Sequence, residues 1–250
     1  MQFEIVVKTI TDFIILEVNE RKAKGVVVGL SGGLDSAVAT SLAVKALGSN
    51  HVFALILPDS PITPTRDVED AKKLAKILKI KYKIIEIGKT KNQFLRHLPK
   101  NKLAKGNFAS RLRMCILYYY AGIMNYLVLG TTDKSEQKLG YYTKHGDGAA
   151  DIFPIADLYK TEVREMARYL QLSSTFIEKK SSPRIWKGQT AESEIGLTYE
   201  EIDNVLKNLG DNDTLRKSKF NAKKVDILTE LMDKNSHKQQ MGPLCKISYK

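Results

Sequence analysis

The sequence predicts an α/β fold: a doubly wound, mainly parallel sheet with helices on both faces. Three observations carry this prediction. Short β-branched runs alternate with longer helical patterns, the first run at residues 25–30 ends in a glycine-rich turn, and the run at 126–130 ends in a polar turn. Ligands bind such sheets beyond the carboxyl ends of strands, where the strand order reverses, so we expect both turns to face one crevice.

The individual elements follow in chain order. An apolar stripe at helical spacing over residues 3–23 precedes the first strand. Further strands are expected at 51–57, 82–87 and 126–130, with helices at 35–47, 67–78, 91–98 and 107–126. From Asp157 onward, helices are expected at 157–170, 199–209 and 222–232, and a long polar segment at 173–198 is typical of a functional loop. No boundary indicates a second domain, so residues 1–250 are expected to form a single one.

Composition and charge narrow the class of protein. No apolar run approaches membrane-spanning length, and the amino-terminal residues lack the basic segment of a signal peptide. Cys115 and Cys245 are the only cysteines and have no metal-binding spacing, so we expect a reduced, cytoplasmic protein that binds no membrane. The net charge of +12 fits a polyanionic small molecule, and no arginine-rich run with interleaved aromatics indicates nucleic acid, although charge alone does not exclude RNA.

A glycine- and serine-rich loop joins the first strand to the next helix. Gly32 and Gly33 allow a phosphate to approach the backbone, and Ser31 and Ser36 add hydroxyl donors. The loop contains no lysine and matches neither GxxxxGK[ST] nor GxGxxG. Because a carboxylate beside a polyphosphate requires a cation between them, we interpret Asp35 as a Mg²⁺ ligand. An ordinary βα turn with incidental glycines is the alternative.

Three cations stand where helices are expected to begin. Asn107 is predicted as an N-cap, which puts Arg111 and Arg113 in the first two turns, where the helix dipole disfavours a cation. Asp157 is predicted to cap a later helix whose third position favours Glu but holds Lys160. A phosphate or carboxylate ligand would explain these cations, and surface ion pairs are the alternative for the arginines.

Polar residues follow the fourth strand at the expected ligand edge. Glu136 is a candidate second Mg²⁺ ligand, and Thr131 is a candidate donor to adenine or phosphate. In the glycine-rich segment that comes next, Lys144 offers a cation, while Asp147 and Asp151 offer hydrogen-bond acceptors or a base. A plain surface hairpin is the alternative for this segment.

Together these segments resemble the ammonia-dependent NAD synthetases, a family within the ATP-pyrophosphatase group that carries an SGGxDS loop. Residues 31–36 match the loop of the wider group, and the narrower resemblance rests on residues 106–114 (GNxxARxRM), 129–136, 143–151 (TKYGDGGxD) and 182–196, the last of the archaeal type. This sequence departs from the family pattern conservatively, with Ser110 for Ala, His145 for Tyr and Ala149 for Gly.

The resemblance implies a role for each segment. The ATP phosphates would be held by Gly29, Leu30, Ser31, Gly32, Gly33, Leu34, Asp35 and Ser36, with Thr131, Lys160 and Ser182. Asp35 and Glu136 would ligate Mg²⁺. Deamido-NAD⁺ would be contacted by Arg111, Lys144, Asp151, His237 and Lys238, partly across a homodimer interface.

The resemblance also implies a reaction. The nicotinate carboxylate of deamido-NAD⁺ attacks the α-phosphorus of ATP, and ammonia then displaces AMP from the acyl-adenylate to give NAD⁺. The loop N–H groups, Lys160 and the Mg²⁺ held by Asp35 would stabilise the departing pyrophosphate, while Asp151 would deprotonate ammonium or orient the pyridine ring. A chain of 250 residues leaves no room for a glutamine amidase domain, so free or separately delivered ammonia is expected.

Two other functions remain open at this point. A tRNA-modifying enzyme of the same loop group would explain the basic charge, but neither an RNA-binding appendage nor paired cysteines are visible in the sequence. A non-catalytic nucleotide-binding protein would keep the glycines, but it would need neither Glu136 nor the segment from Lys144 to Asp151.

Overall fold

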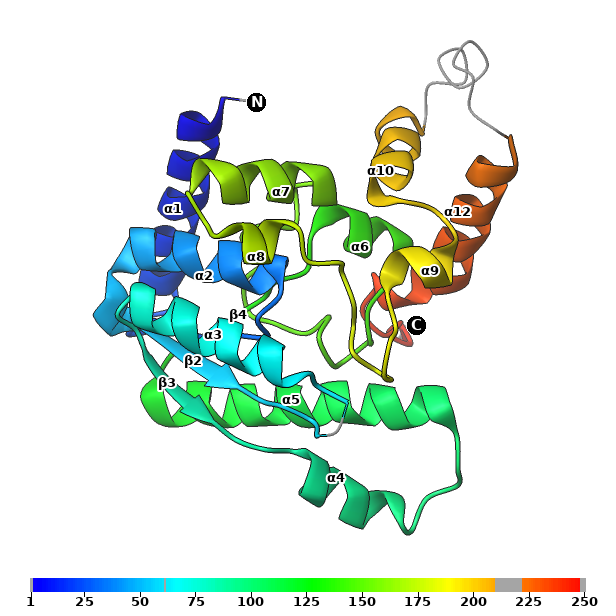
Figure 1. The fold of residues 1–250 in the computed structure, drawn as a ribbon, viewed down its shortest axis with the longest axis horizontal. Coiled ribbons are helices and arrows are strands. Elements are labelled where there is room, and N and C mark those ends of the chain that lie inside the picture. The colour runs from blue at the N-terminus through cyan, green and yellow to red at the C-terminus, as the bar shows by residue number, and fades with distance from the viewer. Residues whose placement is uncertain (1, 61, 210–221, 248–250) are drawn as a thin grey trace.

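The computed structural model describes residues 2–60, 62–209 and 222–247. Within them one sheet has four parallel strands in the order β3-β2-β1-β4, which confirms the predicted fold class (Figure 1). The strands are β1 (Val26–Gly29), β2 (Val52–Ile56), β3 (Lys81–Ile84) and β4 (Leu127–Leu129). The chain moves outward from β1 to β3 and then returns to the other side of β1, so the strand order reverses between β1 and β4.

Helices cover both faces of this sheet, as predicted. One layer contains α1 (Phe3–Glu20), α2 (Leu34–Leu47), α3 (Thr65–Ile77) and α7 (Lys160–Tyr169), and the opposite face is covered by α5 (Lys102–Met124), with α4 (Gly88–Leu95) beside it (Figure 1). Side chains of β1 alternate between the two layers: Val26 and Val28 belong to the first apolar cluster and Val27 to the second. All three are fully buried, as expected for a central parallel strand.

The register of the central strands sets the position of the loops that follow them. Val26 is in register with Val52 of β2 on one side and with Leu127 of β4 on the other. The carboxyl ends of β1 and β4 are therefore level with each other. The glycine-rich loop and the polar turn begin side by side at the point where the strand order reverses.

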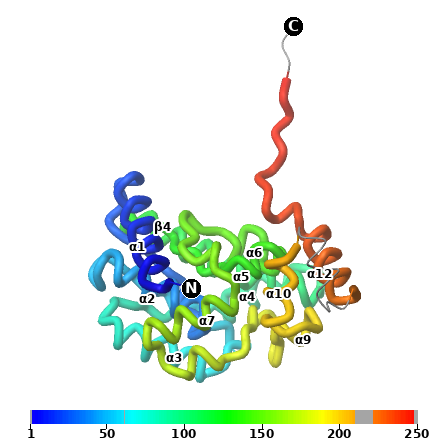
Figure 2. The backbone as a smooth tube through the Cα atoms, turned by 90° about the horizontal axis from the view of Figure 1, so that it is seen from above, coloured from blue at the N-terminus to red at the C-terminus, as the bar shows by residue number. Residues whose placement is uncertain are grey.

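A second group of helices packs around a separate apolar cluster away from the sheet. It consists of α6 (Lys134–Leu139), α9 (Ala191–Ile195), α10 (Tyr199–Asn208) and α12 (Ala222–Asn235). Short turns occur at η1 (Ser49–His51), α8 (Ser174–Ile177) and η2 (Ser236–Lys238). Beyond η2 the described chain ends in an extended segment that projects from the body (Figure 2).

Several predicted element boundaries were wrong. Two of them are helix starts on which the arguments about the site cations depended. The helix expected from Asn107 begins at Lys102, because the side chain of Asn101 accepts the Ala104 N–H at 2.8 Å. Arg111 therefore lies beyond the first two turns, and the helix-dipole argument for it fails. Helix α7 begins at Lys160 itself, not at Asp157, and Glu162 accepts the Tyr159 N–H at 2.9 Å.

The remaining differences concern short elements. Helix α6 was not predicted, since six residues are too few to show a helical period. The polar segment at 173–198 contains α8 and α9 as well as loops. Among helices of the described ranges, none combines the length and the apolar composition that crossing a bilayer requires.

Candidate active site

A buried lysine lies among three carboxylates at the end of the sheet. Lys160 Nζ is 2.7 Å from Asp35 Oδ1, 2.8 Å from Asp133 Oδ2 and 3.0 Å from Glu136 Oε1. The side chains of Lys160 and Asp133 are 0% exposed, whereas those of Asp35 and Glu136 are 20% and 21% exposed. Asp133 therefore lies behind the lysine, and the other two carboxylates face the solvent side.

Three helix N-termini bring these four side chains together. Asp35 is in the first turn of α2, and Lys160 is the first residue of α7. Asp133 caps α6, because its Oδ1 accepts the Glu136 N–H at 2.8 Å, and Glu136 occupies the third position of that helix. The positive ends of α2 and α6 stabilise the carboxylates that they carry.

Burial and mutual charge set the protonation of the cluster. Burial raises the pKa of Asp133 to about 6, against the opposing attraction of Lys160. Burial likewise raises the pKa of Glu136. Burial alone would lower the pKa of Lys160, but the attraction of Asp133, Asp35 and Glu136 outweighs it and holds that pKa well above its ordinary value. The lysine is therefore charged at neutral pH.

The same carboxylates suit a hard cation. One oxygen from each of Asp35, Asp133 and Glu136 lies within 4.8 Å of the others. Carboxylate oxygens without nitrogen or sulfur donors are the ligand set that Mg²⁺ prefers. With all three ionised, one lysine leaves an excess of negative charge that a divalent cation would neutralise.

The glycine-rich loop is held by its own serines and by α3. Ser31 Oγ lies 3.0 Å from Ser36 Oγ and accepts the Gly33 N–H at 3.2 Å. Gly32 has a φ of +77°, and a Cβ at this position would lie 2.1 Å from the carbonyl oxygen of Asp67. Only glycine allows the loop to lie this close to α3.

Two adjoining cavities open beside this cluster. The first, of about 240 Å³, lies at the carboxyl ends of β1, β2 and β4. Predicted residues that line it are Gly29, Leu30, Ser31, Asp35, Thr131, Glu136 and Ser182. The predicted residues Gly32, Gly33, Leu34, Ser36 and Lys160 do not line it.

The second cavity, of about 640 Å³, is lined by four of the residues that the resemblance assigns to deamido-NAD⁺: Arg111, Lys144, His237 and Lys238. Lys144 Nζ donates to the His237 carbonyl at 2.6 Å, and Arg111 Nε donates to the Lys144 carbonyl at 3.3 Å. Lys238 Nζ donates to the Gly140 and Tyr142 carbonyls at 2.7 and 2.9 Å. Residues far apart in the chain thus meet at one basic surface.

The two cavities share part of their walls. Tyr141, Asp147 and Pro183 line both of them. A ligand in the first cavity and a ligand in the second would therefore meet beside these residues.

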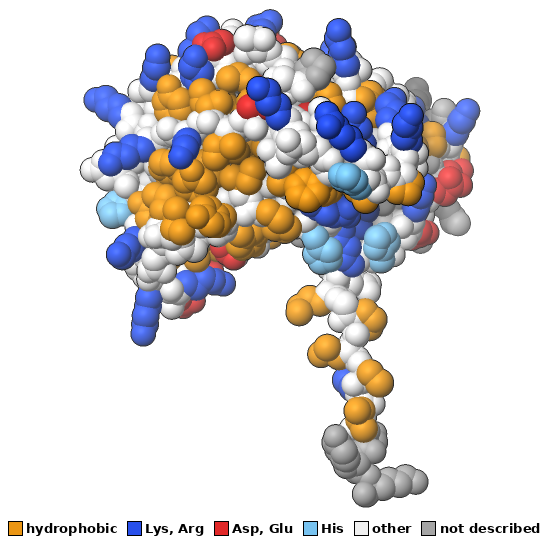
Figure 3. Space-filling view, turned by 90° about the horizontal axis from the view of Figure 1, so that it is seen from below, with side chains coloured by type: hydrophobic (Ala, Val, Ile, Leu, Met, Phe, Trp, Pro, Cys, Tyr) orange, Lys and Arg blue, Asp and Glu red, His pale blue; other side chains and the backbone are white. Residues whose placement is uncertain are grey.

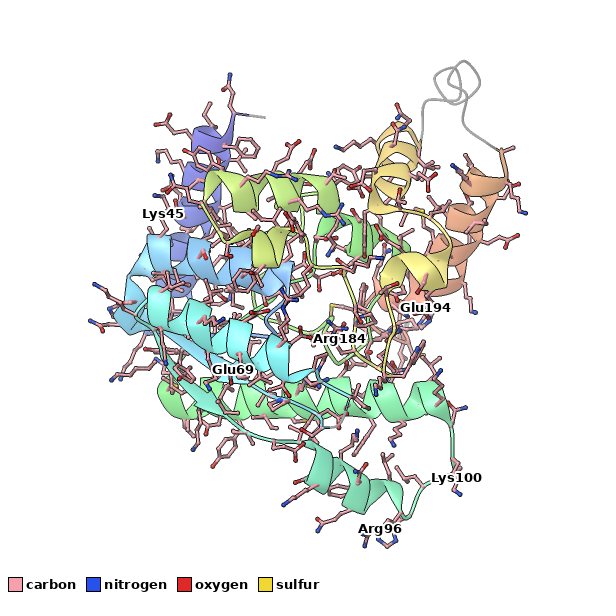
Figure 4. All side chains as sticks on the ribbon, viewed as in Figure 1. Lys45, Glu69, Arg96, Lys100, Arg184 and Glu194 are labelled. Atoms are coloured by element: carbon pink, nitrogen blue, oxygen red, sulfur yellow. The ribbon has the colours of Figure 1, made fainter. Side chains whose placement is uncertain are left out.

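A strap made of residues 178–186 forms part of the wall of both cavities. Lys179 Nζ donates to the Gly32 carbonyl at 2.6 Å and to Asp70 Oδ2 at 2.6 Å. Arg184, which Figure 4 shows near the middle of the molecule, donates from Nε to Asp67 Oδ2 at 2.9 Å. The strap is therefore tied to both the glycine-rich loop and α3.

Asp151 is the one predicted residue that the structure separates from the rest. It lines neither cavity of its own chain. Its Oδ2 accepts the Val128 N–H at 2.7 Å. It also bonds the Tyr118 hydroxyl, and burial together with this bond raises the pKa of Tyr118 to about 12.

Three residues of the site escaped the sequence analysis. Asp133 had a recognisable signal, since Asp133 followed three residues later by Glu136 is a capping-box pattern. Tyr199, whose ring centroid is 5.1 Å from Lys160 Nζ, and Asp203, which bonds Ser135, come from α10 and had none. The helix-dipole argument for Arg113 was wrong, but Arg113 lines the first cavity and its Nε donates to the Leu57 carbonyl at 2.9 Å.

Comparisons with known proteins agree with this geometry. The sequence profile of the family described as NAD synthase matches residues 6–242. An NH(3)-dependent NAD(+) synthetase of Archaeoglobus fulgidus is 44% identical over 248 residues, covering 99% of this chain and 98% of that protein. The protein of the same name from Methanocaldococcus jannaschii is 43% identical over 253 residues, with 98% and 97% covered.

Solved structures give the same result. An NMN synthetase from Francisella tularensis superposes with a TM-score of 0.90 at 35% identity, covering 99% of this chain and 100% of that one. An NH3-dependent NAD synthetase from Campylobacter jejuni, in complex with the nitrate ion, has a TM-score of 0.85 at 36% identity, with 98% and 100% covered.

Proposed function

The chain belongs to the NAD synthase family and is a ligase that amidates deamido-NAD⁺ with ammonia at the expense of ATP, and we propose that its two adjoining cavities hold the two large substrates. The observation that carries this proposal is the wall that the two cavities share. Tyr141, Asp147 and Pro183 line both, so the α-phosphorus of one substrate would come within reach of the carboxylate of the other.

The first cavity suits ATP. The backbone N–H groups of residues 31–36 lie at the N-terminus of α2, where an anion is favoured by both hydrogen bonds and the helix dipole. Thr131 and Ser182 add hydroxyl donors to the wall. Lys160 supplies, from the next layer, the positive charge that the loop itself lacks.

Asp35 and Glu136 are the residues that would hold Mg²⁺. They are the two carboxylates of the cluster that line the first cavity, whereas Asp133 is fully buried against Lys160. When bound, the ion neutralises charge that develops on the leaving pyrophosphate. Lys160 contacts both carboxylates and holds them in place.

The second cavity suits deamido-NAD⁺. Arg111, Lys144 and Lys238 present positive charge to a dinucleotide that carries a pyrophosphate and a carboxylate. His237 reaches the same wall from the end of α12. These residues are far apart in the chain, so local sequence patterns do not predict that they lie together. Their proximity in the structure supports the role that the family resemblance implies for each.

The reaction then needs positioning and charge neutralisation rather than a protein nucleophile. A carboxylate oxygen of deamido-NAD⁺ forms a bond to the α-phosphorus, and the bond from that phosphorus to pyrophosphate breaks. Ammonia next forms the C–N bond, loses a proton to a base, and AMP leaves with the electron pair of the C–O bond. The loop N–H groups and Lys160 stabilise the pyrophosphate in the first step.

Two copies of the chain are proposed to pair through the face formed by α4, α5 and β3. Hydrophobic side chains gather on the side of the molecule that Figure 3 shows. The exposed hydrophobic residues of these three elements are Ile84, Phe94, Leu103, Tyr119 and Ile123. A contiguous apolar surface of this kind is typical of an interface. Pairing would let Asp151, which serves no cavity of its own chain, reach the second substrate of a partner. Light scattering on the wild type and on Ile123→Glu tests this: a dimer that the substitution leaves intact contradicts the interface.

A cytoplasmic location and a single domain over residues 1–250 are also proposed. Both described cysteines are free and exposed, which suits a reducing compartment. The family profile covers residues 6–242 without interruption, which supports one domain.

The function is tested by one assay with several outcomes. Protein, ATP, Mg²⁺, ammonium and deamido-NAD⁺ are mixed, and the products NAD⁺, AMP and pyrophosphate are measured. We expect the three products to form in equal amounts. Nicotinic acid mononucleotide is offered in a parallel reaction, because a solved relative is an NMN synthetase. Preference for the mononucleotide would contradict the dinucleotide as substrate. Formation of ADP, dependence on tRNA or absence of turnover would contradict the reaction itself.

A further inference from the structure

Helix α10 carries a buried carboxylate that bonds to both neighbouring helix N-termini. Asp203 is 2% exposed. Its Oδ1 accepts the Ser135 hydroxyl of α6 at 2.5 Å, and its Oδ2 accepts the Thr161 N–H of α7 at 2.8 Å. Ser135 Oγ in turn accepts the Lys160 N–H at 2.9 Å. The first two N–H groups of α7, which no helical carbonyl can satisfy, are thus both tied to Asp203.

The same face of α10 also contacts the lysine side chain. Tyr199 lies four residues before Asp203, so the two project from one side of the helix. Its ring centroid is 5.1 Å from Lys160 Nζ, and the residue is 1% exposed. An ammonium over an aromatic face is stabilised electrostatically. Helix α10 therefore fixes Lys160 at its backbone and at its charged end.

We propose that Asp203 is a positioning residue for ATP-dependent chemistry: through Ser135 and Thr161 it sets the place of Lys160 among Asp35, Asp133 and Glu136. Asp203 lines neither cavity and would touch no substrate. Its effect reaches the reaction only through the lysine. The inference rests on the role of Lys160 proposed above.

The chemistry of the contact explains why a carboxylate is needed. Asp203 receives two hydrogen bonds, one at each oxygen. An asparagine of the same shape has one acceptor oxygen and one donor NH₂ group, so it satisfies only one of the two donors. The other donor would be left without a partner in a buried place, and the start of α7 would shift to relieve it.

The test is a kinetic comparison of Asp203→Asn with the wild type, per mole of folded protein. We expect kcat/KM for ATP to fall by about 10- to 100-fold, the scale of an ångström-sized misplacement, and the KM for deamido-NAD⁺ to stay within about twofold. A purely structural role would lower the folded fraction and leave both KM values and kcat per folded molecule unchanged, which would overturn the proposal. A rise in the KM for deamido-NAD⁺ as large as the loss in kcat/KM for ATP would overturn it too.

Glu200→Gln is the matched control. Glu200 also joins α10 to α7, through Arg164 Nη1 at 2.5 Å, but its side chain is 63% exposed and outside the cluster. Its substitution is expected to leave both kinetic constants unchanged. A loss like that of Asp203→Asn would show that any α10–α7 contact suffices and would contradict the proposal.

Ser135→Ala keeps the test decisive if Asp203→Asn does not fold. It removes the hydroxyl between Asp203 and the Lys160 N–H, so the same ATP-specific loss is expected. In the variant that combines Asp203→Asn with Ser135→Ala, the fold-loss in kcat/KM for ATP should be smaller than the product of the two single fold-losses. The reason is that both substitutions break the same chain of hydrogen bonds. Strictly multiplicative losses would contradict this shared chain.

Lys160→Met separates this proposal from the one on which it rests. If Lys160→Met keeps full activity, the proposed role of the lysine fails, whatever Asp203→Asn does. If Lys160→Met is inactive and Asp203→Asn is unaffected, only the positioning role fails.

Discussion

Lys160 Nζ and Asp133 Oδ2 are 2.8 Å apart, and neither side chain is exposed to solvent. A charged pair sealed in this way is costly to desolvate, and breaking it leaves an uncompensated charge. Two further carboxylates, Asp35 and Glu136, contact the lysine from the cavity side. The pair is therefore the fixed part of the site, and the two exposed carboxylates are the part available to a metal ion.

Replacing Asp133 tests this division. In Asp133→Asn the cap of α6 is retained, because asparagine also caps helices, but Lys160 loses its fully buried charge partner, so the free energy of unfolding should fall by about 3 kcal/mol. The charge behind Lys160 is lost, and we expect kcat/KM for ATP in AMP formation to fall by about 10-fold or more. Asp157→Asn, whose side chain is 94% exposed and pairs with Lys134, is the matched control. Equal activity of the two variants would remove Asp133 from the site.

Gly106 is expected to resist substitution because the strap packs directly on it. A Cβ at Gly106 would lie 1.6 Å from Ile185 Cγ2, so Gly106→Ala should destabilise the protein by about 1–3 kcal/mol, the cost of overpacking. Gly122 lies in the same helix α5 with nothing within 4 Å of its Cβ position, so Gly122→Ala should instead stabilise by about 0.5–1 kcal/mol. Urea denaturation measures both. Equal changes in the two variants would mean that Ile185 does not rest on Gly106.

Lys179 is expected to hold the strap on the glycine-rich loop. Lys179→Met keeps the aliphatic stem but removes the charge that contacts Asp67, Asp70 and the Gly32 carbonyl. We expect a loss of about 2–4 kcal/mol in unfolding free energy and a raised KM for ATP. Lys180→Met, at the exposed neighbouring position, is the control and should change neither quantity. A wild-type KM for ATP in Lys179→Met would show that the loop needs no support from the strap.

Glu86 gives a prediction about pH. Burial would raise its pKa, but N–H groups of Ser60, Lys89 and Gly88 donate to the carboxylate and lower it below its ordinary value of 4.5. A group whose pKa is lower in the folded state stabilises the fold above the unfolded pKa, and that contribution is lost as pH falls through the folded pKa. The stability difference between wild type and Glu86→Gln should therefore be largest above pH 4.5 and shrink below it.

Denaturation of both proteins at several pH values measures this difference. Because Glu86 is exposed, we expect only about 0.5–1 kcal/mol at neutral pH, the scale of a charge at a helix start. Glu165→Gln replaces another exposed glutamate, on α7, and should show no such pH dependence. A difference that grows at low pH would contradict the assignment.

Local patterns in the sequence were enough for the fold class and for part of the site. Alternating strands and helices predicted the sheet, and the loop from Gly29 to Ser36 was placed at a strand end that the structure confirms. Such features depend on neighbours in the chain, so the sequence carries them directly. Helix starts were less secure: Asn101 caps α5 and Asn107 does not, because a cap depends on the path of the preceding chain.

The sequence by itself therefore determined the sheet, the glycine-rich loop at the end of β1 and, through the family resemblance, the reaction. Only the tertiary structure decided which charges face one another. Lys160 meets Asp35, Asp133 and Glu136 because three helices begin at one point, and Asp203 supports them from a helix more than forty residues further along the chain. The strength of these interactions depends on burial and on the distance between the charges, and the spacing of residues along a chain determines neither.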